Sequence, residues 1–243
     1  MVIVAVAVAL HALFQRRFKP EILRRHNDVA GFLFSVVGVI YAVVLGFVVV
    51  VVWEKYGTTV SNVETEIAAV SDLYRAVGGF DEPARSQIRS GLREYVRNII
   101  DVEWPQMSKD VIVGPDLQLL EEVAHQVESY KPKNEGQSND QLTADDQIVR
   151  LFDARRLRLI QSAPSIPSIL WFALFAGAVA VLAFAFLFGS ENRPAQLVMT
   201  AILAGLIGVM FVVISEFDGP FDGSVSISDD GWVILQQHLT KIP

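Results

Sequence analysis

The sequence contains no cysteine. It therefore has no means of forming a disulfide, a thiolate metal site or a cysteine nucleophile. Histidine is scarce as well, and its four positions are too far apart in the sequence to suggest a ligand set: His11, His26, His125 and His238. There is no GxSxG, HExxH or Walker motif. We therefore predict no catalytic residues, no metal, no cofactor and no enzymatic activity.

Basic side chains are outnumbered by acidic ones. The 20 Lys and Arg residues face 27 Asp and Glu residues, which gives a formal net charge of -7. No stretch forms a basic stripe or alternates basic with aromatic residues, the patterns that bind a phosphate backbone. We therefore exclude a nucleic-acid partner.

Residues 30–53 contain no charged side chain. A helix of this length is about 36 Å long, enough to cross a hydrocarbon core of about 30 Å. Asn27 and Asp28 precede the segment as capping residues, and Trp53 and Tyr56 follow it as interface aromatics. The pattern predicts a membrane-spanning helix.

Three further apolar segments accompany this span: residues 1–14, 166–188 and 195–214. The first is short for a span, and we expect its His11 to be a neutral residue at the membrane interface. The last two are separated by a short turn, so they are predicted to form an antiparallel hairpin. Because these spans carry no ionisable group near their middle, a transporter is disfavoured.

Most charged residues lie in the polar insert 54–165, which holds 13 of the 20 basic and 19 of the 27 acidic side chains. Apolar residues at helical spacing predict that the second span continues outward as a stalk, followed by further helices. Within the insert, residues 131–141 are predicted to be a mobile loop, with Thr143 capping the next helix.

The fold class follows from these segments. We predict an all-α, polytopic helical membrane protein with about four transmembrane helices and a helical extramembrane domain inserted between the second and third. Its predicted parts are the first two spans with a basic loop (1–53), the extramembrane domain (54–165), the transmembrane hairpin (166–214) and an extramembrane C-terminal tail (215–243).

The loop 15–29 sets the predicted orientation. Its basic side chains are Arg16, Arg17, Lys19, Arg24 and Arg25. A short loop this basic belongs on the cytoplasmic side. Counting crossings from it, the insert 54–165 is predicted to be extracytoplasmic.

Small residues recur along one face of the second span, at Gly31, Ser35, Gly38, Ala42 and Gly46. This spacing favours close helix packing, and a pore-lining surface is the alternative. Because the stripe is longer than one neighbouring helix would need, we predict a homo-oligomer. Tyr41, in mid-span, is expected to face protein because its hydroxyl needs a hydrogen-bond partner.

Three arginines lie near the end of the insert: Arg155, Arg156 and Arg158. They could form an anion site at a pore mouth or a set of ion pairs within the stalk. If the second span leaves the membrane near residue 53 and the third enters near residue 166, helical residues whose numbers sum to about 219 lie level. The predicted neighbours are Glu64 with Arg155, Ser61 with Arg158, and Glu66 with Arg156.

Several segments together resemble the bacterial bestrophin-like domain family of multi-pass membrane proteins. They are residues 26–56, DLYR at 72–75, DVEWPQM at 101–107, residues 155–171 and EFDGPFDGSVSIS at 216–228. Gly219 stands where we expect the family to place a basic residue. The resemblance implies a bacterial plasma membrane, and it places the extramembrane bulk in the cytoplasm, opposite to the positive-inside count.

Two function classes follow. The first is an oligomeric, bestrophin-like ion channel or pore, with the lipid bilayer, further copies of the chain and ions as its partners. The second is a membrane-anchored sensor or scaffold whose helical extramembrane domain binds a partner.

Overall fold

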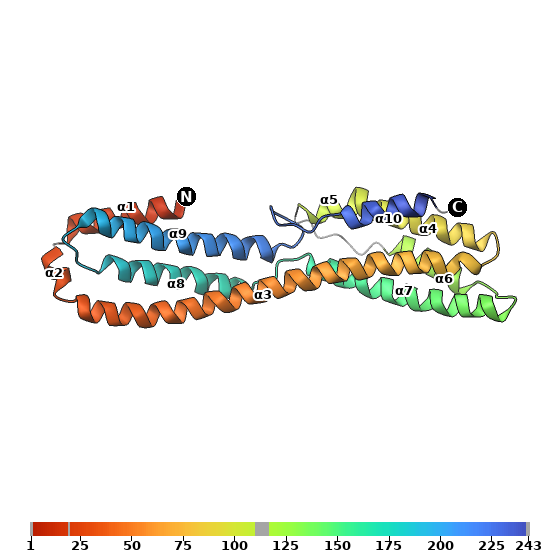
Figure 1. Cartoon of the computed structure of the whole chain (residues 1–243), viewed down its shortest axis with the longest axis horizontal. Coiled ribbons are helices and arrows are strands. Elements are labelled where there is room, and N and C mark those ends of the chain that lie inside the picture. Colours follow the sequence, from red (N-terminus) through yellow and green to blue (C-terminus); the bar gives the residue numbers. More distant parts are fainter. Residues whose placement is uncertain (1, 19, 110–116, 242–243) are drawn as a thin grey trace. The chain divides into compact units, whose positions relative to one another are not determined.

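The computed structural model describes residues 2–18, 20–109 and 117–241, and it contains helices but no strand within these ranges. The all-α prediction is confirmed (Figure 1). The helices are α1 (Val2–Arg17), α2 (Pro20–Arg24), α3 (Asn27–Ala76), α4 (Ala84–Asn98), α5 (Trp104–Met107), α6 (Gln118–Glu128), α7 (Glu135–Gln161), α8 (Ser168–Phe186), α9 (Arg193–Asp218) and α10 (Asp230–Lys241). A 3₁₀ turn, η1 (Val77–Gly79), follows α3, and a π-helical segment, η2 (Ile99–Glu103), joins α4 to α5.

Within the described ranges, three helices are long and apolar enough to cross a membrane: α3, α8 and α9. They correspond to the second, third and fourth predicted spans. The first predicted span is α1, which has 16 residues, somewhat fewer than the roughly 20 that a full crossing needs.

The chain forms two compact units. One contains residues 1–54 and 166–218, and the other contains residues 55–165 and 219–243. The single helix α3 supplies residues to both units.

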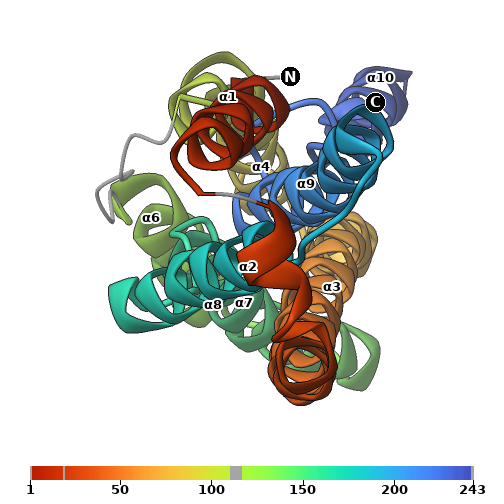
Figure 2. The same cartoon turned by 90° about the vertical axis from the view of Figure 1, so that its left-hand side faces the viewer.

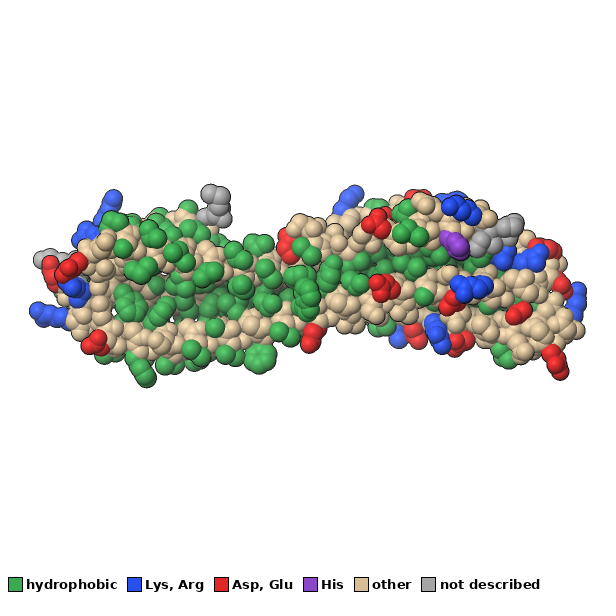
Figure 3. Space-filling model, in the orientation of Figure 1, with side chains coloured by type: hydrophobic (Ala, Val, Ile, Leu, Met, Phe, Trp, Pro, Cys, Tyr) green, Lys and Arg blue, Asp and Glu red, His purple; other side chains and the backbone are tan. Residues whose placement is uncertain are grey.

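The first unit consists of α1, α2, the beginning of α3, α8 and α9 (Figures 1 and 2). Its small core is made of Tyr41, Val48, Val52, Leu174, Ala178, Val181, Ile207, Phe211 and Ile214. Large apolar side chains also cover its visible surface (Figure 3), and Phe32, Phe47 and Phe172 are each at least 69% exposed. A surface of this kind suits a hydrocarbon environment and would aggregate in water.

The second unit is organised around a larger core. Each of its main helices turns one apolar stripe inward, as the helical spacing in the sequence predicts. The fully buried large side chains include Leu73 and Tyr74 of α3, Leu92 and Tyr95 of α4, and Trp232 of α10. The C-terminal helix α10 packs on α4 and is therefore part of this unit's core.

The predicted mobile loop at 131–141 is wrong, because α7 begins inside it at Glu135. Asn134 caps the helix by accepting a hydrogen bond from the backbone N–H of Gln137 (2.9 Å). The side chain of Gln137 accepts from the Lys133 N–H (2.8 Å) and donates to Asp81 (3.2 Å). Thr143 is an interior helix residue whose hydroxyl bonds back to the carbonyl of Asn139 (2.9 Å). The polar composition of residues 131–141 therefore reflects the solvated first turns of α7 and the connection that precedes it.

Candidate functional site

The small-residue face of α3 is the first candidate site. Ser35, Ala42 and Gly46 are exposed, and Gly31 and Gly38 are half-buried. A Cβ added at Gly38 or Gly46 would meet no heavy atom within 4 Å, and one at Gly31 would meet only the ring of Phe188, at 3.8 Å. No helix of the chain therefore packs closely along this face within the part that the structure describes.

The face of α3 that does pack lies elsewhere around the helix. Tyr41 is 7% exposed, and its ring covers Gly177 of α8 so closely that an added Cβ there would lie 2.3 Å from it. Since each residue turns the helix by about 100°, Tyr41, Val48 and Val52 lie roughly a quarter-turn from the small-residue face. Tyr41 thus faces protein, although its hydroxyl has no hydrogen-bond partner among the described residues.

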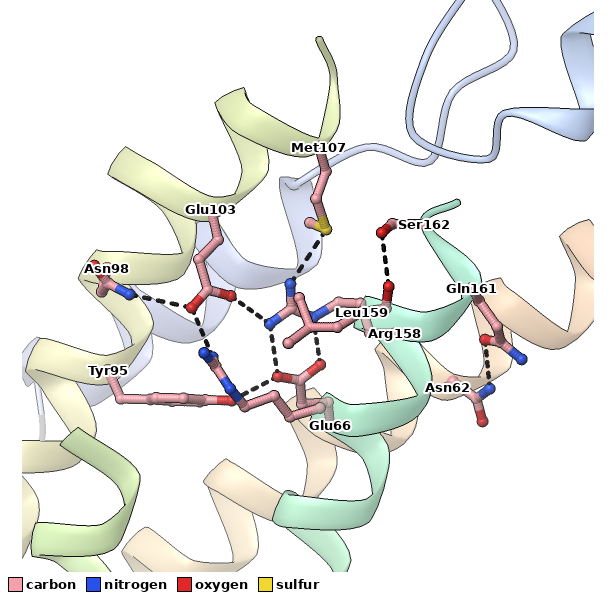
Figure 4. A network of polar contacts seen from close by, with 11 residues as sticks. Asn62, Glu66, Tyr95, Asn98, Glu103, Met107, Arg158, Leu159, Gln161 and Ser162 are labelled. Atoms are coloured by element: carbon pink, nitrogen blue, oxygen red, sulfur yellow. Dashed lines mark hydrogen bonds and ion pairs between the residues drawn. The ribbon is translucent and has the colours of Figure 1, made fainter. Parts of the chain in front are cut away.

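A buried ion-pair network in the second unit is the other candidate site (Figure 4). Arg158 of α7 donates two hydrogen bonds to Glu66 of α3, from Nε to Oε2 (2.7 Å) and from Nη2 to Oε1 (3.1 Å). It also donates to Glu103 Oε2 (2.7 Å), and Arg155 donates to Glu103 Oε1 (2.6 Å). The Tyr95 hydroxyl donates to Glu66 Oε1 (2.6 Å).

All four charged side chains of this network are at most 3% exposed. Two carboxylates balance two guanidinium groups, so the network as a whole is neutral. Burial by itself lowers the pKa of Arg158, but the adjacent Glu66 outweighs that effect and the net pKa is raised. Burial, together with the charge of Glu66, raises the pKa of the Tyr95 hydroxyl well above 10. The arginines are therefore permanently charged and Tyr95 remains a donor at neutral pH.

The π-helical turn η2 brings Glu103 into this network. Ile99 and Glu103 are the buried residues of the turn, and Asn98 donates to Glu103 Oε1 (3.2 Å). A π-turn shifts the side chains that follow it around the helix axis, and such turns often occur at functional sites. The network consequently joins α3, α4 with its π-turn, and α7.

The model of the bestrophin-like domain matches residues 1–231. The chain belongs to the bestrophin-like family. No functionally curated protein matches it.

Solved structures with the bestrophin fold are similar to the chain over its whole length. One variant of a bacterial bestrophin homologue from Klebsiella pneumoniae has a TM-score of 0.69 at 12% identity, and the match covers 98% of this chain and 99% of that one. Two other variants have TM-scores of 0.70 at 13% identity, covering 98% of this chain and 98% or 97% of theirs. At this identity the likeness shows that the two chains share a fold.

The predicted stalk pairs of this bestrophin-like chain differ from those in the structure. Arg158 pairs with Glu66 and not with Ser61, Arg155 binds Glu103, and Glu64 is exposed. Arg156 is also exposed, and it pairs with Asp153 on its own helix (3.1 Å).

The reason for the difference is a register error of four to five residues. Asn62 hydrogen-bonds Gln161 (2.7 Å), where the predicted rule placed residue 58 level with 161. The helix α7 ends at Gln161, and α8 begins only at Ser168. A non-helical connection advances by up to about 3.3 Å per residue, against about 1.5 Å in a helix, so counting at helical rise misplaces α7.

Sequence reasoning missed Glu103 and the buried position of Glu66, although a signal was present. Glu66 lies three residues after Val63 and four before Val70, on the buried stripe of α3. Glu103 continues the stripe of α4, four residues after Ile99. An acidic residue at an apolar position on two helices, with arginines at such positions on a third, predicts a buried ionic cluster.

The basic loop lies partly in α1 and α2. Arg16, Arg17, Arg24 and Arg25 are exposed, and Arg24 pairs with Glu191 in the turn between α8 and α9. Lys19 lies outside the described residues. Within those residues no group of three His, Asp or Glu side chains converges as a metal site would require.

Proposed function

We propose that this bestrophin-like protein assembles from several copies into an ion channel in the bacterial plasma membrane. The observation that carries the proposal is the open small-residue face of α3. Within the described residues, a Cβ added at Gly38 or Gly46 would meet no heavy atom within 4 Å. This face would pack against a second copy of the chain or line a conduction path.

The rest of the exposed surface of α3 differs from this face. Phe32, Ile40 and Phe47 are 62–70% exposed and lie on other sides of the helix. Large apolar side chains of this kind suit lipid contact. Small residues let a second backbone approach closely, and van der Waals packing at such faces drives helix association in membranes.

Two further observations support the proposal. The helices α3, α8 and α9 are long and apolar enough to span a bilayer. The helix α8 contains no ionisable residue, and α9 contains none between Arg193 and Glu216. The family takes its name from a family of channels, and its model matches residues 1–231. A passive pore fits these spans better than a coupled transporter, which normally needs ionisable groups at the midplane.

Ion flux into liposomes that contain the purified protein tests the proposal. We expect flux above that of protein-free liposomes, and an assembly larger than a monomer by mass measurement in detergent. Gly38→Leu should abolish both without lowering the thermal stability of the protomer, because a Cβ at residue 38 meets no atom of another described element within 4 Å. Ile40→Leu, at an exposed position about 160° around the helix from Gly38, is the matched control and should change neither.

A monomeric protein without flux would contradict the proposal. An oligomer that conducts no ion tested would favour the alternative, a membrane-anchored sensor or scaffold whose helical extramembrane unit binds a partner.

A further inference from the structure

A chain of polar side chains lies buried in the first unit, between α1 and α9. The His11 ring is fully buried, its Nδ1 is 2.7 Å from the Thr200 hydroxyl, and its Nε2 is 3.3 Å from Gln15 Nε2. Gln15 also donates to Gln196 Oε1 (3.0 Å). Sequence reasoning placed His11 at the membrane interface, but here it is the centre of a network that joins two helices.

The hydrogen-bond partners at the two ends of this network fix the position of each proton within it. The carbonyl oxygen of Phe188 only accepts, so Gln196 presents its amide nitrogen there and its oxygen to Gln15. Gln15 must therefore donate with its nitrogen, both to Gln196 and to His11 Nε2. Nε2 consequently carries no proton.

At the other end, the Thr200 hydroxyl donates to the carbonyl of Gln196 (3.1 Å). Its oxygen is then free to accept a hydrogen bond from His11 Nδ1–H. The network is satisfied by one form of the imidazole alone, the neutral ring with its proton on Nδ1.

A second proton on His11 would break this arrangement. It would set Nε2–H against the N–H of Gln15. If the Gln15 amide turned over to accept that proton, its nitrogen would leave Gln196 Oε1. Gln196 has no means of compensating by turning too, because its own nitrogen is bound to Phe188.

Among the described residues no carboxylate hydrogen-bonds to this network, and Glu191, in the turn that follows Phe188, is exposed and pairs with Arg24. On α1 the charged groups are Arg16 and Arg17, and α8 has none and faces His11 with the Phe186 ring, stacked at 4.6 Å. On α9 they are Arg193, near the network, and Glu216 with Asp218, whose sequence distance from Thr200 corresponds to about 24 Å or more of helix. The ring face of Phe186 offsets only part of the cost of a buried, unpaired cation.

Apart from this network, α1 packs on α9 through apolar side chains, with Val4 beside Gly205 and Ile3 beside Gly208. Ala7 and His11 are its only buried residues within the described range. We propose that His11 is a proton-sensitive latch, which keeps α1 docked on α9 while the ring is neutral and releases the helix when the ring is protonated.

Spin labels test the latch directly, because the chain has no cysteine of its own. Leu13→Cys on α1 and Val198→Cys on α9, which are 63% and 58% exposed, would carry nitroxides in lipid nanodiscs. Labelled protein is diluted with unlabelled protein so that only distances within one chain are measured. We expect one short, narrow distance population at pH 7.5 and its loss, to longer and broader distances, at pH 4.5.

His11→Asn is the deciding variant, since its amide nitrogen replaces Nδ1 as donor to Thr200 and does not titrate. It should remain docked at both pH values. His26→Asn removes an exposed histidine and should leave the response unchanged. An unchanged distance at pH 4.5 in the parent protein, or the same acid response in His11→Asn, would overturn the proposal.

Discussion

Arg158 and Glu66 are joined by two parallel hydrogen bonds, of 2.7 and 3.1 Å, and neither side chain has any exposed surface. A pair of this kind differs from an exposed salt bridge, which contributes about 0–1 kcal/mol. Inside the second unit each charge depends on its partner, because removing one leaves the other buried and uncompensated.

Glu66→Gln should therefore lower the stability of the protein strongly, by about 3–5 kcal/mol, because it leaves the two arginines with one carboxylate. The thermal unfolding midpoint of the protein in detergent is the measurement. Glu64→Gln is the matched control, two residues away on the same helix and exposed, and it should leave the midpoint unchanged. Equal effects of the two substitutions would contradict the burial of the network.

Removing both partners should cost less than removing one. In Glu66→Met/Arg158→Met, Glu103 and Arg155 remain as a balanced pair 2.6 Å apart, so no net charge is left in the core. We expect the double variant to unfold at a higher temperature than Glu66→Met alone. Additive losses would show that the two side chains act independently.

Tyr95→Phe should destabilise the protein by about 1.5–3 kcal/mol at neutral pH, because Glu66 loses a donor at 2.6 Å. The substitution should also change how the stability of the protein depends on pH at alkaline pH. The folded pKa of Tyr95 is raised above its ordinary value of 10, so the unfolded chain releases this proton first. That stability is present below pH 10 and is lost as the pH rises above it.

Unfolding midpoints between about pH 9 and pH 11 test this, since the loss of stability should be shallower in Tyr95→Phe than in the parent protein. Tyr130→Phe is the comparison, because its hydroxyl accepts from the backbone N–H of Asp81 instead of donating to a carboxylate. It should keep the slope of the parent. Identical slopes in all three proteins would count against the raised pKa of Tyr95.

Gly177→Ala should weaken the packing of α3 on α8 by about 1–3 kcal/mol, because its Cβ would lie 2.3 Å from the ring of Tyr41. Gly46→Ala, with no atom within 4 Å, should be tolerated. Tyr41→Leu should partly rescue Gly177→Ala by making room. Thermal midpoints of the four proteins in detergent measure this, and an absence of rescue would show that the strain is relieved elsewhere.

The side of the membrane that holds the insert 54–165 is open to a direct experiment. From the basic residues of the loop 15–29 we expect the insert to be extracytoplasmic, whereas the bestrophin resemblance implies the cytoplasm. Asn139→Cys in α7 and Glu21→Cys in α2 place single exposed thiols in the insert and in the loop. In intact cells an impermeant thiol reagent should label Asn139→Cys and spare Glu21→Cys. The reverse pattern would place the insert inside.

The sequence by itself determined the helical class, the apolar segments and the inward stripes of the soluble helices. These features depend on local periodicity and on segment length, which can be read without knowing the partners of any helix. The charge-free run at 30–53 indicated a membrane span, and Ile88, Leu92 and Tyr95, which are buried on one face of α4, recur at the helical spacing of four and three residues. The position of the small-residue face on α3 was likewise present in the spacing of Gly31, Ser35, Gly38, Ala42 and Gly46.

Only the tertiary structure decided which residues meet. The non-helical connection between Gln161 and Ser168 shifted the register, so Arg158 reached Glu66, and the π-turn at Ile99–Glu103 added an acid from a third helix. In the first unit it joined His11 to Thr200, 189 residues apart. Contacts of this kind depend on the rise of every intervening connection, and a shift of one turn, about 5.4 Å, exchanges one set of partners for another.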